Sequence, residues 1–106
     1  MALLNRWVLT AQLVERGALR YTPAGLPALD VMLRHASTLT EDGQPRQVSA
    51  EFKAVAIGAI ARPVGAMALG SSGDFAGFLA QTRNGRGIRF HITSLESVPS
   101  ETLLAD

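Results

Sequence analysis

Cysteine is absent from the 106 residues of this sequence. This absence excludes disulfide bridges, thiolate zinc sites and cysteine nucleophiles, and it is typical of a reducing compartment, so we expect a cytoplasmic protein. Histidine is also scarce, with only His35 and His91. Neither stands in a serine or carboxylate constellation, and we therefore expect hydrogen-bonded structural histidines, no enzyme activity, no metal and no cofactor.

Long apolar runs are missing as well. The N-terminal residues lack the charged start and extended apolar core of a signal peptide. The most apolar later stretch, residues 54–69, is interrupted by Arg62 and Pro63, well short of the ~20 apolar residues that span a membrane. We expect no contact with a membrane.

Lysine is limited to Lys53, against nine arginines, and the formal net charge is only +1. Arginine suits phosphate oxygens, although a GC-rich genome also favours arginine codons. Acidic residues are absent between Asp74 and Glu96, the interval that contains three of the arginines. This local imbalance predicts a positively charged segment that would suit a polyanion.

Asn84-Gly85 lies inside that interval, between the apolar runs 75–80 and 88–95. An Asn-Gly pair between two apolar runs is typical of a two-residue hairpin turn, in which both central residues take positive φ. We therefore predict a protruding β-hairpin whose positive tip no acidic residue opposes.

Apolar and polar residues alternate along much of the chain, which is typical of half-buried strands. We predict five strands, over residues 5–16, 28–36, 46–57, 74–80 and 88–95, with loops over 17–27 and 38–45. Proline is tolerated in the first turn of a helix, so a short helix should begin near Arg62 or Pro63. Gly77 inside the fourth strand predicts a bend or bulge.

This order of elements predicts an all-β protein of the OB-fold class, a five-stranded Greek-key barrel with a helical connection between strands three and four. We expect the barrel domain to comprise residues 1–99, with a short tail over 100–106. OB-folds bind oligonucleotides on strands two and three and on the loops after strands one and four. Seven candidate DNA-binding residues fall on that surface: Arg20, Tyr21, Arg34, Lys53, Arg83, Arg86 and Arg89.

Several short motifs occur in this order along nearly the whole chain: Asn5-Arg6-Trp7-Val8-Leu9, the segment 22–27 (Thr-Pro-Ala-Gly-Leu-Pro), Leu33-Arg34-His35, Arg46-Gln47, Gly77-Phe78, and Asn84-Gly85 followed by Phe90-His91-Ile92. Together they resemble the family of primosomal replication protein N, or PriB, which is related to bacterial single-stranded DNA-binding protein. The resemblance implies an OB-fold homodimer that binds single-stranded DNA during replication restart. It also implies the PriA helicase as a partner, and DnaT where that protein exists.

The resemblance maps the basic contacts of the family onto Arg20, Arg34 and Arg83, with Arg86 and Arg89 nearby. The sequence departs from the family on strand three, where members can carry an aromatic residue and this chain has Val48-Ser49-Ala50. Base stacking on an aromatic is worth ~1–3 kcal/mol, so binding should weaken unless another aromatic substitutes. The candidates for that substitution are Tyr21, Phe52 and Phe75.

Three hypotheses remain at this stage. The first is a single-stranded-DNA-binding accessory of the restart primosome. The second is an OB-fold adaptor for protein partners with weak DNA binding, which the near-neutral charge and the missing aromatic favour. The third is an unrelated small β-barrel enzyme, whose only support is that pockets are invisible in a sequence. An apolar first strand rich in Trp7, Val8 and Leu9 would need covering, as in a homodimer.

Overall fold

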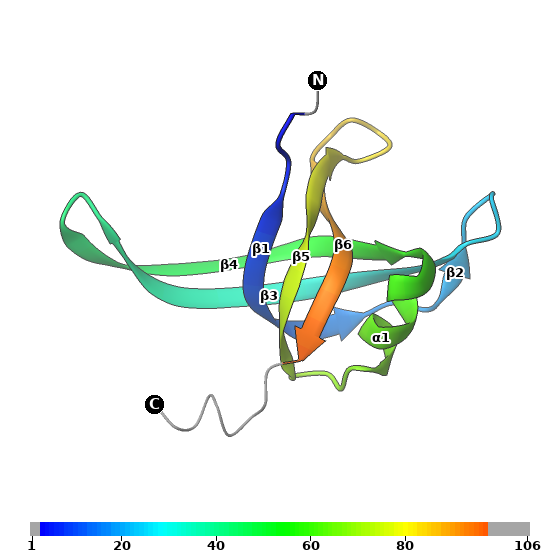
Figure 1. The fold of residues 1–106 in the computed structure, drawn as a ribbon, viewed down its shortest axis with the longest axis horizontal. Coiled ribbons are helices and arrows are strands. Elements are labelled where there is room, and N and C mark those ends of the chain that lie inside the picture. The colour runs from blue at the N-terminus through cyan, green and yellow to red at the C-terminus, as the bar shows by residue number, and fades with distance from the viewer. Residues whose placement is uncertain (1–2, 98–106) are drawn as a thin grey trace.

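The computed structural model describes residues 3–97 of the chain, which form a strand-rich barrel (Figure 1). The predicted tail, residues 100–106, lies outside this range. The strands are β1 (Trp7–Arg16), β2 (Arg20–Tyr21), β3 (Pro27–Glu41), β4 (Gln44–Ile57), β5 (Ser72–Gln81) and β6 (Ile88–Ser97). A 3-10 turn, η1 (Gly58–Ile60), and the short helix α1 (Ala61–Ala66) connect β4 to β5.

The strands follow the order β1-β5-β6-β4-β3-β2, and an additional pairing of β1 with β3 closes the barrel. The β4–β6 pair is parallel, and the other pairs are antiparallel. The five long strands and the helix between β4 and β5 confirm the predicted OB-fold. The prediction of a loop over 17–27 was incomplete, because Arg20 and Tyr21 form β2 by pairing with Ala28 and Pro27 of β3.

Alternation along the strands supplies the core. Leu13 of β1, Leu33 of β3 and Phe75 of β5 are fully buried, and burying such a side chain stabilises the fold by about 1.5–3 kcal/mol. Val64 of α1 is fully buried with them. The helix starts one residue before the predicted position, which keeps Pro63 in its first turn.

The β3–β4 arm, residues 36–49, is the longest projection of the molecule, and the predicted β5–β6 hairpin projects at another end of the barrel (Figure 1). The two strands stay paired out to Glu41 and Gln44, so the prediction of a loop over 38–45 was wrong. Asp42 and Gly43 form the two-residue turn, with φ values of 51° and 74°, as a tight hairpin connection requires. Residues 38–47 of this arm are all exposed, so the alternation of apolar and polar residues that marks a half-buried strand is missing there.

Gly77 confirms the predicted bulge. The β5–β6 register shifts between Ala76 and Gly77, and a Cβ at residue 77 would collide with the carbonyl oxygen of His91. Only glycine therefore lets the two backbones approach this closely. No helix within residues 3–97 is long and apolar enough to cross a membrane.

Candidate nucleic-acid interface

Three of the cationic side chains predicted to bind DNA lie together on one surface of the barrel. Leu29, Val31 and Leu33 of β3 point into the core, so the residues between them point outward. In the register of β4, β6 and β5, the outward side of the strands runs from Asp30, past the buried Val55, to His91 and Phe78. We call it the outer face, and define it by Arg20, Asp30, Lys53, Phe78, Arg89 and His91.

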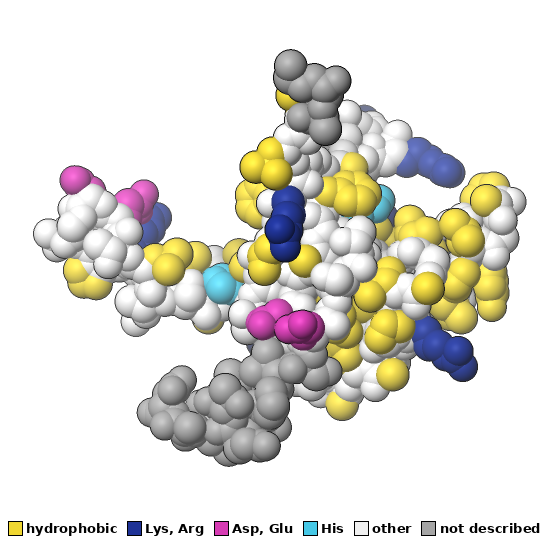
Figure 2. Space-filling model, in the orientation of Figure 1, with side chains coloured by type: hydrophobic (Ala, Val, Ile, Leu, Met, Phe, Trp, Pro, Cys, Tyr) yellow, Lys and Arg dark blue, Asp and Glu magenta, His cyan; other side chains and the backbone are white. Residues whose placement is uncertain are grey.

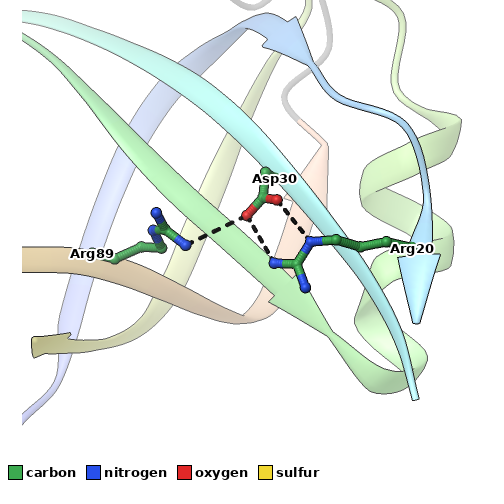
Figure 3. Close-up of polar contacts among 3 residues, drawn as sticks. All are labelled: Arg20, Asp30 and Arg89. Carbon is green, nitrogen blue, oxygen red and sulfur yellow. Dashed lines mark hydrogen bonds and ion pairs between the residues drawn. The ribbon is translucent and has the colours of Figure 1, made fainter. Parts of the chain in front are cut away.

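Asp30 holds two arginines of the outer face (Figure 3). Arg20 donates from Nε to Oδ2 at 2.9 Å and from Nη2 to Oδ1 at 3.2 Å, a two-pronged contact with the carboxylate. Arg89 approaches from β6, with Nη1 3.6 Å from Oδ1. The hydrogen bond and the charge of Asp30 raise the pKa of Arg20, so its guanidinium stays charged.

The prediction of an unopposed positive hairpin was therefore wrong at Arg89. The opposing acid comes from β3, a strand distant in sequence, so the acid-free interval from Asp74 to Glu96 could not reveal it. Arg83 and Arg86 are exposed in the loop itself. Among the described residues, neither of these two forms an ion pair.

The loop between β5 and β6 is also wider than the predicted two-residue turn. The ladder ends at the Gln81–Ile88 pair, and Thr82 N–H donates to the Gly87 carbonyl at 2.9 Å. Asn84 does not take positive φ, and its side-chain oxygen instead accepts from the Arg86 backbone N–H at 3.0 Å. This side-chain contact with its own backbone stabilises a broad turn in place of a tight one.

Arg34 lies farther along β3, paired with Glu51 on β4 at 2.9 Å. Arg46 and Glu41 form a similar pair at 2.8 Å at the tip of the β3–β4 arm, where acidic and basic side chains lie together (Figure 2). Exposed pairs of this kind contribute about 0–1 kcal/mol to stability. A phosphate can therefore compete for these arginines at little cost to the fold.

Lys53 faces the hollow at the centre of the outer face, which has a volume of about 360 Å³. Arg89 and Asp30 line the same hollow, together with Glu15 and Arg16 of β1. Arg16 is committed to the fold, since its Nη1 donates to the Met67 carbonyl at 2.6 Å. The structure thus brings Arg20, Lys53 and Arg89 together.

Of the other predicted residues, Arg34 lies farther along β3, and Arg83 and Arg86 lie in the β5–β6 loop. Tyr21 adjoins Arg20 on β2 and is 66% exposed. Of the three aromatics suggested as stacking substitutes, Phe75 is fully buried. Phe52 packs edge-on against Phe90 with ring centroids 6.2 Å apart.

An aromatic pair that the sequence analysis missed lies on the outer face. The rings of Phe78 and His91 stack with centroids 4.8 Å apart and an interplanar angle of 9°. Burial, and then the charge of Arg89, lower the pKa of His91, so its imidazole is neutral at pH 7. The sequence signal for His91 is its place between Phe90 and Ile92. Both neighbours are core residues, so His91 points to the opposite face of the strand.

A second hollow, the apolar groove, lies between the β3–β4 arm and β1 and has a volume of about 480 Å³. We define it by Trp7, His35, Leu39, Val48, Phe52 and Ile88. His35 is structural, as predicted, because Nδ1 donates to the Thr10 carbonyl at 2.7 Å and Nε2 accepts from the Ser37 hydroxyl at 2.8 Å. In the described range, residues 3–97, no group of three or more histidines and carboxylates is arranged to hold a metal ion.

A closed OB barrel with arginines and an aromatic pair on its outer face defines the class of OB-fold ligand-binding proteins. Residues 5–94 match the model of a family described as another single-strand binding protein family. The single-stranded DNA binding protein of Thermus aquaticus superposes with a TM-score of 0.74 at 25% identity, over 93% of this chain and 52% of that one.

Still greater similarity is found among replication restart proteins. The structure of PriB from Ralstonia solanacearum superposes with a TM-score of 0.84 at 37% identity, over 92% of this chain and all of that one. Replication restart protein PriB of Bordetella pertussis is 44% identical over 80 residues, which are 76% of this chain and 75% of the relative. The chain belongs to the PriB family.

Proposed function

We propose that this protein binds single-stranded DNA during replication restart and that the outer face and the β5–β6 loop grip the DNA backbone. The observation that carries this proposal is the gathering of Arg20, Lys53 and Arg89 on the surface that OB-folds use for oligonucleotides. Similarity to the Thermus aquaticus protein supports the ligand, and the names of the PriB relatives support the process.

Arginine contacts to phosphate hold DNA without reading its sequence. Arg83 and Arg86 on the exposed loop offer guanidiniums with no ion-pair partner among the described residues. Arg20 and Arg89 must first release Asp30. Binding is therefore expected to be sequence-independent, weak and dependent on salt.

A titration of labelled oligothymidine at several salt concentrations tests this proposal. Each phosphate contacted on a single strand contributes about −0.7 to the slope of log K against log salt, so four arginine contacts give a slope near −3. A flat salt dependence would rule out the arginine–phosphate grip.

A second candidate function is that of a protein adaptor with weak DNA binding. Four arginines, at positions 20, 34, 46 and 89, are paired with carboxylates, and on the face drawn in Figure 2 the basic side chains are scattered singly. The partners implied by family membership are the PriA helicase and, where it exists, DnaT. Catalysis forms no part of either candidate.

The triple variant Arg83→Ala, Arg86→Ala, Arg89→Ala separates the two candidates. If the protein acts as an adaptor, the variant still captures purified PriA helicase while its affinity for oligothymidine falls. If both activities disappear while the circular dichroism spectrum is unchanged, the two functions share one surface.

We also propose that the protein is a homodimer, in which a second copy covers the edge of β1 and the adjoining apolar groove. Residues 7–11 pair with β5 on one side, and in the described chain no strand pairs with residues 7–11 on the other. Trp7 is 53% exposed and Val8 is 61% exposed there. An exposed apolar edge of this kind favours pairing with another strand, and a two-fold axis lets identical edges pair.

A further inference from the structure

We infer that the Phe78–His91 pair is the base-stacking subsite of this protein, where an unpaired nucleobase of single-stranded DNA lies against the ring of Phe78. This inference rests on the proposed function and names the groups that contact the bases. The segment Val48-Ser49-Ala50 of β4 has no aromatic, so the stacking group has to come from another strand, and Phe78 lies on β5.

The ring of Phe78 has the exposure and support that a stacking platform needs. Its side chain is 38% exposed although Phe78 lies in the middle of a strand, and the parallel ring of His91 lies 4.8 Å away as a backing. The two residues are direct partners in the β5–β6 ladder. A platform on paired strands keeps its orientation, so little entropy is lost when a base stacks on it.

Cations suited to the sugar–phosphate backbone lie beside this platform. Arg89 precedes His91 by two residues on the same face, a spacing of about 6.7 Å along a strand. Its charge adds to the effect of burial in lowering the pKa of His91. Lys53 lies on the neighbouring strand β4 and lines the same hollow as Arg89. Cations that track the backbone beside an aromatic that receives bases are the recurring design of single-strand-binding surfaces.

Two other aromatics lack a free ring face for a base. Phe75 has no exposed surface, and Phe52 is held edge-on against Phe90 inside the apolar groove. Tyr21 is exposed, on the two-residue strand β2. Tyr21 is therefore the natural comparison residue for an experiment on Phe78.

The test compares two oligonucleotides of equal length and charge, one of thymidines and one of abasic sites, at fixed salt. We expect the wild type to prefer the thymidine strand, and Phe78→Leu to lose about tenfold in affinity for it while keeping its affinity for the abasic strand. Phe78→Tyr should retain the preference, because it keeps the ring. A fold loosened by Phe78→Leu would weaken both complexes, which separates stacking from a structural effect.

Three outcomes would overturn the subsite. One is a Phe78→Leu protein that prefers the thymidine strand as strongly as the wild type. Another is a Tyr21→Leu protein that loses the whole preference while Phe78→Leu keeps it. In both cases salt-dependent binding by the wild type would leave the proposed function intact. A wild type that binds neither strand refutes the proposed function and the subsite together.

Discussion

At the scale of single residues, Asp30 controls how much positive charge the outer face presents. Its carboxylate contacts both Arg20 and Arg89, in the geometry that a DNA phosphate would also use. The acid and the DNA therefore compete for the same two guanidiniums. Removal of this acid should affect DNA binding more than removal of an acid elsewhere on the barrel.

The substitution Asp30→Asn tests this competition. We expect single-stranded DNA to bind about two- to tenfold more tightly, with a salt slope steeper by up to about 1.4 because two arginines become available. The matched control is Asp74→Asn, which removes the same charge from β5, where Asp74 accepts a hydrogen bond from the Thr10 hydroxyl at 2.6 Å. Equal gains in the two variants would show that only net charge matters.

His91 gives a prediction on pH. Its pKa is lower in the folded protein than its ordinary value of 6.5, through burial and the charge of Arg89. The unfolded chain therefore binds more protons than the folded protein below pH 6.5. The contribution of His91 to the free energy of unfolding is complete above pH 6.5 and declines as the pH falls below that value. Phe78, Val55 and Arg89 are its neighbours on β5, β4 and β6, and Asp30 lies beyond Val55 on β3.

Denaturant unfolding between pH 5 and pH 8 measures this effect. The difference in unfolding free energy between the wild type and His91→Gln should be constant above pH 6.5 and should shift against the wild type at lower pH. Parallel curves for the two proteins would exclude His91 as the source. The comparison between variants removes the contributions of the other titrating groups.

At the scale of elements, the contact between β5 and β6 depends on Gly77. The substitution Gly77→Ala would place a methyl group against the carbonyl of His91, so we expect a loss of roughly 1–3 kcal/mol in unfolding free energy, as for overpacked cores. Gly65→Ala is the control, since its Cβ would meet Leu29 at an ordinary 3.5 Å in a helix that favours alanine. Similar midpoints for Gly77→Ala and the wild type would contradict the close approach.

At the scale of the whole molecule, the β1 edge and the apolar groove determine the oligomeric state. Sedimentation at micromolar concentration should give a dimer, and Trp7→Glu should give a monomer because it puts charge at the covered surface. Leu19→Glu is the control. The Leu19 and Trp7 side chains are both 53% exposed, but Leu19 lines a separate hollow beside α1, so the Leu19→Glu protein should remain a dimer. The dimer proposal would fail if the wild type were a stable monomer.

The sequence by itself determined the barrel. Alternation located the five long strands, Pro63 located the helix between β4 and β5, and Gly77 marked the bulge, because each of these signals is local to a few consecutive residues. The short motifs also gave the resemblance to the PriB family, which the comparisons confirm. Local patterns failed for the β3–β4 arm, where residues 38–47 are all exposed and show no alternation of burial.

Only the tertiary structure decided what the outer face contains. The sequence placed Arg20 in the loop over 17–27 and Arg89 at the start of the strand over 88–95, but their shared carboxylate, Asp30, comes from β3. Likewise Phe78 and His91 meet only because the β5–β6 ladder sets them opposite one another. Contacts across strands depend on register, which the whole barrel fixes, whereas a sequence pattern reports each strand alone.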